Sequence, residues 1–143
     1  MSGSRAVLVT PVAEPQVLAA ACALAKIRAE VVPTEVGSVA VLHEAEGEGP
    51  AAAGATLSRV VTGALVVLLR TDGSQVTAAG WTDGRPTEVQ AAGLWLDAAP
   101  AVLEDLVTGQ AEPSGLEGVV SSAGMSRWRA ARTLARLARK ARS

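Results

Sequence analysis

Aromatic residues are almost missing from this chain of 143 residues, which contains no Phe, no Tyr and three Trp. Hydrophobic residues nevertheless make up 49% of the sequence, so the core must be built from Ala, Val and Leu, and small side chains let backbones pack closely. A chain of this length is expected to bury most of its apolar surface in the core of one domain.

Cysteine and histidine are equally scarce. The single cysteine, Cys22, excludes an internal disulfide framework and a cysteine-based zinc site. The single histidine, His43, ends a predicted strand beside Glu44, and no HxH, HExxH, GxSxG or Ser-His-Asp arrangement accompanies it. The sequence therefore predicts no catalytic residue, no metal site and no cofactor, and we expect that the chain is not an enzyme.

Long hydrophobic runs are also missing. The longest, at 17–25 and 64–69, fall far short of the about 20 residues that a membrane span requires. The first 12 residues lack a hydrophobic stretch of the signal-peptide type followed by a small-residue cleavage site. We therefore expect a cytoplasmic protein with no membrane span.

The first half of the chain predicts an α+β fold. Strands are expected at 5–12, 30–33, 38–43 and 64–70, and a hairpin turn at 34–37 that ends in Gly37 joins the second to the third. Helices are expected at 14–28, with Pro15 in the first turn, and at 55–62, with a loop at 44–54. This βαββαβ order is that of a ferredoxin-like sandwich. A hairpin turn at 71–74, with Gly73 at the positive-φ position, is expected to add an antiparallel strand at 75–81.

The predicted helix 14–28 has almost no polar face. Its polar residues, Gln16, Lys26 and Arg28, lie at its ends. A helix that is apolar all round is covered on more than one side, so we expect it between the sheet and either another helix or a partner subunit. This pattern is also the basis for expecting a homo-oligomer, with a dimer as the commonest assembly.

After a second turn at 82–84, the segment 87–98 fits either a helix or a third meander strand. A capping box of Thr87 and Gln90 favours the helix. Pro100 and Gly109 bound a further helix at 101–108. The expected organisation is a core domain at 1–109, a connector at 110–124 in which Val119 and Val120 could still dock, and a basic helix at 125–143.

One segment has the glycine spacing of a phosphate-binding P-loop. In Gly-Pro-Ala-Ala-Ala-Gly-Ala-Thr at 49–56, however, Ala55 stands where such a loop needs its lysine, and no strand comes directly before it. Glu44, Glu46 and Glu48 precede the segment and would repel a phosphate. The sequence therefore favours an acidic loop that leads into a helix over a nucleotide site.

Charge is divided sharply along the chain. The segment 125–143 contains seven of the 13 lysines and arginines and no acidic residue, whereas 1–124 carries all 14 acidic residues and a formal charge of −8. On a helical wheel, five cations lie within about 100° of one another, and Ala130 and Leu134 lie on the opposite side of the helix. They are Arg129, Arg132, Arg136, Arg139 and Lys140. Ser126 is placed to cap the helix.

We expect these five cations to be the partner-binding residues of a non-enzymatic adaptor or regulatory module, whose partner is nucleic acid or an acidic protein surface. A membrane surface is less favoured, because the apolar face lacks the bulk to insert. An alternative is a small-ligand-sensing ferredoxin-like domain, in which the basic helix is structural or part of an oligomer interface. In that alternative, the helix docks on the acidic body, and Leu134 and Leu137 cover the sheet.

Overall fold

The computed structural model describes residues 4–72, 75–123 and 125–142, and the side chains of Asp72, Arg127 and residues 137–142 lie outside the described part. The strands are β1 (Arg5–Val9), β2 (Ala29–Thr34), β3 (Gly37–Leu42), β4 (Leu65–Asp72), β5 (Gln75–Thr82), β6 (Arg85–Thr87) and β7 (Val120–Ser121). The helices are α1 (Pro15–Leu24), α2 (Gly49–Val60), α3 (Ala92–Ala98), α4 (Ala101–Thr108) and α5 (Arg127–Arg142), with a 3₁₀ turn, η1 (Pro113–Gly115).

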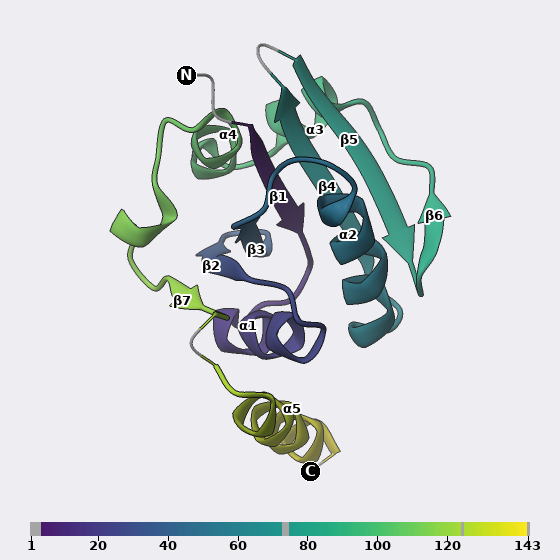
Figure 1. The fold of residues 1–143 in the computed structure, drawn as a ribbon, viewed down its shortest axis with the longest axis vertical. Coiled ribbons are helices and arrows are strands. Elements are labelled where there is room, and N and C mark those ends of the chain that lie inside the picture. The colour runs from purple at the N-terminus through teal and green to yellow at the C-terminus, as the bar shows by residue number, and fades with distance from the viewer. Residues whose placement is uncertain (1–3, 73–74, 124, 143) are drawn as a thin grey trace.

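The strands form one antiparallel sheet in the order β6-β5-β4-β1-β3-β2-β7 (Figure 1). The expected α+β class is confirmed, and β5 returns antiparallel along β4 as predicted. With seven strands among the described residues, the sheet is larger than the predicted sandwich. Its extra strands include β6 and β7, which the sequence did not predict, and β7 lies in the connector 110–124.

Both faces of the sheet are apolar and both are covered by helices. On β1, Ala6 and Leu8 pack on the face that α1 and α2 cover, whereas Val7 and Val9 pack on the face that α3 and α4 cover (Figure 1). Side chains alternate between the faces of a strand, so a strand covered on both sides is a continuous apolar run. Each fully buried Leu or Val stabilises the fold by about 1.5–3 kcal/mol.

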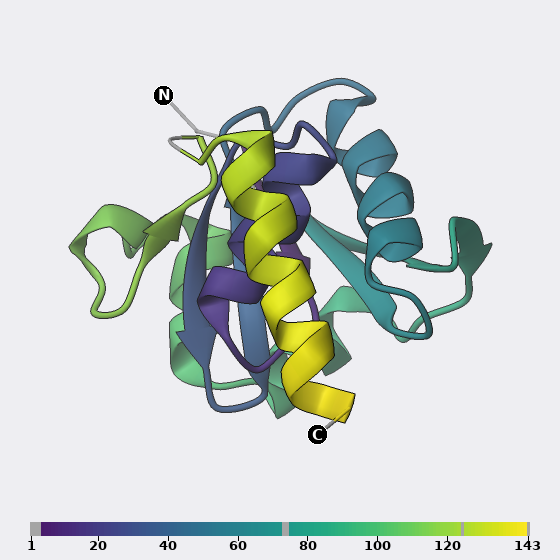
Figure 2. The same cartoon turned by 90° about the horizontal axis from the view of Figure 1, so that it is seen from below.

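Helix α1 is covered on both sides, as its sequence predicts. Leu18 and Ala19 pack in the core beside the sheet, whereas Ala20 and Ala23 pack on the opposite side against α5. Figure 2 shows α5 lying across α1 on the side away from the sheet. The chain's own helix thus covers the surface from which a homo-oligomer was expected. Self-association therefore remains a prediction, but the apolar surface of α1 no longer supports it.

Several helix boundaries differ from the sequence prediction. Helix α1 ends at Leu24 and not at 28, because Lys26 adopts a positive φ. Helix α2 begins at Gly49 and not at 55, because Pro50 fits the first turn and the alanines after it favour a helix. Thr87 does not cap a helix: it ends β6, and its hydroxyl donates to Thr82 Oγ1 at 3.2 Å. The helical alternative holds for the later part of 87–98, where α3 begins at Ala92.

The turns agree with the residue types that favour them. Gly37, in the predicted β2–β3 hairpin, has φ +134°, and a Cβ there would lie 2.2 Å from the carbonyl oxygen of Thr10. Asp83 and Gly84 both have positive φ in the β5–β6 hairpin. Gly109 ends α4 in the left-handed conformation, as predicted. The predicted turn residue Gly73 lies outside the described residues.

Candidate functional site

Helix α5 is held against α1 by small side chains. Ala130 is fully buried against Ala20 and Ala23, and the half-buried Met125 and Leu134 pack around this contact. The helix begins where the sequence predicts, because Ser126 Oγ accepts a hydrogen bond from Arg129 N at 3.1 Å. Alanine on both helices permits close approach, so a short apolar stripe is enough to dock α5.

The predicted basic stripe lies on the opposite side of α5. Arg129, Arg132 and Arg136 are exposed, and neither ion pair found among the described residues involves this helix. Arg139 and Lys140 belong to the same helix, but their side chains lie outside the described part. Of the two leucines expected to cover the sheet, Leu134 packs with Ala20 and Ala23 of α1, and the side chain of Leu137 lies outside the described part.

An exposed tryptophan stands beside this stripe. Trp128, in the first turn of α5, is 73% exposed, and Arg132 comes four residues later on the same side of the helix. No pattern in the sequence indicated this exposure. Together, Trp128, Arg129, Arg132 and Arg136 form a surface of one aromatic ring and three guanidinium groups, which we call the α5 surface.

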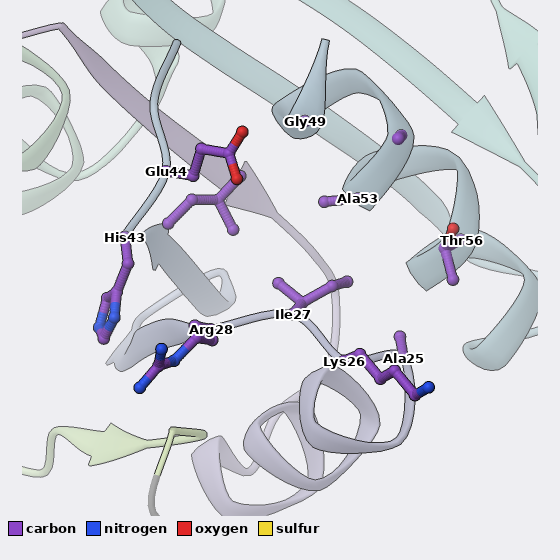
Figure 3. Close-up of a pocket in the computed structure, with 11 residues that line it drawn as sticks. Ala25, Lys26, Ile27, Arg28, His43, Glu44, Gly49, Ala53 and Thr56 are labelled. Carbon is purple, nitrogen blue, oxygen red and sulfur yellow. The ribbon is translucent and has the colours of Figure 1, made fainter. Parts of the chain in front are cut away.

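A pocket of about 320 Å³ lies elsewhere on the molecule, where three segments meet. Its residues come from the loop after α1, from the end of β3 and from the first turns of α2 (Figure 3). They include Lys26, Ile27, Arg28, Leu42, His43, Glu44, Gly49 and Thr56, with Ala25, Ala52 and Ala53 between them. The sequence singled out His43 and the segment 49–56 separately, but no local motif indicated that they share a pocket.

The two groups in this pocket that are most typical of catalysis have structural partners. His43 Nε2 lies 3.1 Å from Glu30 Oε1, and both side chains are partly exposed. Glu44 lies over the start of α2, where a Cβ on Gly49 would be 2.6 Å from its Oε1. A carboxylate at that place complements the positive end of the helix dipole. Figure 3 shows Thr56, the hydroxyl residue of the lining, across the pocket from His43, and no hydrogen bond of the described residues joins the two into a catalytic pair.

A second hollow, of about 420 Å³, has a largely polar lining that includes Glu46, Arg70 and Gln75. Its arginine already has a partner, because Arg70 donates to the carbonyl oxygen of Ala45 at 3.0 Å. Cys22 is buried in the core, and burial raises the pKa of its thiol to about 12. That thiol is therefore protonated at neutral pH.

Within the described ranges, no cluster of three or more His, Cys, Asp or Glu side chains could hold a metal ion. None of the helices seen there combines the length and apolar character needed to cross a membrane. Comparison of the chain with protein-family models, with curated proteins and with solved structures finds no match. Any functional proposal for this protein therefore rests on the geometry of the α5 surface and of the pocket.

Proposed function

We propose that the protein is a non-enzymatic adaptor or regulatory module, located in the cytoplasm, that binds nucleic acid through the α5 surface. The observation that carries the proposal is the orientation of α5. Its apolar stripe is used in docking on α1, and Arg129, Arg132 and Arg136 face solvent. A rigid, cationic helix face is suited to a partner with regularly spaced negative charges.

The docking of α5 separates the candidate partners. An amphipathic helix binds a membrane by burying its apolar face, but here Ala130 is already buried against α1. A nucleic acid needs only the exposed face, because phosphates pair with guanidinium groups and an aromatic ring stacks on an unpaired base. The exposed Trp128 therefore favours nucleic acid over an acidic protein surface, which stays the second candidate.

At the level of fold, we propose that β1–α1–β2–β3–α2–β4 is a ferredoxin-like unit extended by β5, β6 and β7. Within the sheet, these four strands are neighbours in the order β4-β1-β3-β2, and every pair is antiparallel. In this proposal, α5 is an additional helix that packs on helix α1 of that unit. The fold alone assigns no partner, because such sandwiches have many functions.

The test is binding of the full chain to a labelled DNA duplex and to a single strand, measured by fluorescence anisotropy over a range of salt concentrations. If four or five phosphates are neutralised, the slope of log K against log salt on the duplex is about −4. The change of Arg129, Arg132, Arg136 and Arg139 together to Gln should remove most of this affinity. A second readout is Trp128→Ala, which should weaken the single-strand complex by about 1–3 kcal/mol.

A matched pair of double variants serves as the control for overall charge. Arg132→Gln with Arg136→Gln removes two cations from α5, and Arg59→Gln with Arg85→Gln removes two exposed cations from elsewhere. Only the first pair should weaken binding and make the slope less steep by about 2. Equal losses in both pairs, or a wild-type affinity independent of salt, would contradict the proposal. Binding to an acidic peptide but not to either DNA would support the second candidate.

A further inference from the structure

The pocket beside α2 has the lining of a small-molecule site. Ile27 and Leu42, each less than a tenth exposed, form its apolar floor, and polar side chains stand around the rim. Its volume of about 320 Å³ is at the small end of ligand pockets, which range from about 300 to 1,000 Å³. Such a pocket fits a short molecule with an apolar body and one polar head group.

The charges on the rim indicate the sign of that head group. Glu44 lies against Gly49 at the start of α2, where its charge complements the helix dipole, and His43 Nε2 lies 3.1 Å from Glu30 Oε1. Lys26 and Arg28 are exposed and take part in neither ion pair of the described region. Figure 3 shows Lys26 and Arg28 on either side of Ile27, with Glu44 further along the rim beside Gly49. The cations are the groups left for a ligand, which favours an anion.

The backbone of Lys26 gives a second, independent indication. Its φ is +61°, because it comes after the last turn of α1 in the left-handed conformation that ends many helices. The N–H groups of Lys26 and Ile27 donate to Ala23 O at 3.1 Å and Cys22 O at 2.8 Å, which fixes this geometry. Glycine is the residue that adopts it without strain.

A comparison with Asp83 shows that Lys26 is the unusual case. These two are the non-glycine residues with positive φ in the part of the chain that the structure describes. Aspartate tolerates this conformation, and Asp83 Oδ1 also accepts a hydrogen bond from Gly63 N at 3.1 Å. No side-chain hydrogen bond of the described region involves Lys26, so, unlike Asp83, its side chain does nothing within the fold to offset the strain. Strain of this kind is typical of positions where the side chain serves a ligand.

We propose that this pocket binds a small organic anion with a short apolar body, such as a short-chain carboxylate. Lys26 contacts the anionic head, and Ile27, Leu42 and Ala53 contact the body. The site is separate from the α5 surface, so either proposal can fail without the other. In this proposal, Lys26 lowers the stability of the fold through its positive φ and contributes to binding of the anion.

The experiment titrates the full chain with hexanoate and with hexanamide, which differs only in the charge of its head, and monitors backbone amides by NMR. Hexanoate should give saturable shifts confined to residues 25–28, 42–44 and 49–56. Hexanamide should bind at least about tenfold more weakly than hexanoate, because it lacks the charge-assisted contacts. Equal affinity for the two probes, or no saturable shift up to about 20 mM hexanoate, would overturn the proposal.

Variants at position 26 test both effects of Lys26, on stability and on binding. Lys26→Gly should weaken hexanoate about tenfold and raise Tm by about 2–4 °C, because glycine relieves the left-handed strain. Lys26→Arg should retain the affinity, and Arg129→Gln, on α5, should leave it unchanged. Hexanoate affinity that survives in Lys26→Gly, or a Tm that falls in this variant, would show that the lysine does not have the proposed role.

Discussion

Helices α1 and α5 lie against each other but are stabilised in opposite ways. Helix α1 has no polar face and is enclosed between the sheet and α5, so nearly every residue from Leu18 to Ala23 is buried. Helix α5 contacts α1 through Ala130 and Leu134, and most of its other described side chains are exposed. The comparison shows that the first helix is part of the core, whereas the second is attached to it and is free to present charge.

The largest expected effect distinguishes the enclosed helix from the surface. Leu18→Ala should lower the free energy of unfolding by about 2–5 kcal/mol, because Leu18 is fully buried between α1 and the sheet. Leu94→Ala is the matched control, since Leu94 is 56% exposed on α3 and should cost about 0.5 kcal/mol or less. Urea unfolding measures both, and similar losses would break the comparison.

The contact between the two helices should respond to overpacking. Ala130→Leu places a larger side chain against Ala20 and Ala23 and should cost about 1–3 kcal/mol. Ala131→Leu, one residue along on the exposed side of α5, should change stability by about 0.5 kcal/mol or less. Thermal unfolding compares the two variants. A neutral Ala130→Leu would mean that α5 does not dock on α1 through these alanines.

High pH should weaken the fold through α1. Burial raises the pKa of the Cys22 thiol from 9.0 to about 12, so the unfolded chain loses this proton first as the pH rises. The contribution of the protonated thiol to the free energy of unfolding is therefore complete below pH 9. It is lost toward pH 12, at about 1.4 kcal/mol per pH unit. The free energy of unfolding of Cys22→Ala, measured against pH, should not show this decrease. Identical slopes between pH 8 and pH 10.5 in both proteins would contradict the prediction.

The smallest expected effect is on stability at the exposed side of α5. Arg132→Gln with Arg136→Gln should change the free energy of unfolding by about 0.5 kcal/mol or less, because both side chains are exposed and neither ion pair of the described region includes them. The same pair should weaken DNA binding, because it removes two phosphate contacts from the α5 surface. Thermal unfolding provides the check, and a large loss would mean that the stripe is structural after all.

Local signals in the sequence were enough to predict the elements that depend on near neighbours. The Gly37 turn, Pro15 in the first turn of α1 and Gly109 after α4 each favour one backbone geometry, and those elements were confirmed. The sequence could not place β7, whose two residues pair with β2 about 90 positions away. Ser122, next to β7, is buried and hydrogen-bonded to Ala29 N at 2.9 Å, a contact that no periodicity reveals.

The candidate sites show the same division. Charge and wheel position predicted the basic stripe, and the exposure of Arg129, Arg132 and Arg136 agrees with it. The surface that α5 docks on was not predictable, because alanine contacts leave no distinctive pattern. The pocket also escaped prediction, since it is assembled from 25–28, 42–44 and 49–56, which meet only through the β2–β3 hairpin and the return of α2.

The short strands at the two ends of the sheet have a consequence for the behaviour of the protein at high concentration. An exposed strand edge is a template for pairing with another molecule, and long flat edges promote aggregation. Here one edge is β6, three residues long with Pro86 at its centre, and the other is β7, with two residues. Because β6 pairs only with Gly80, Trp81 and Thr82 of β5, no described strand lies along the outer side of β5 from Gln75 to Ala79. This stretch is where a strand of another molecule would find backbone to pair with.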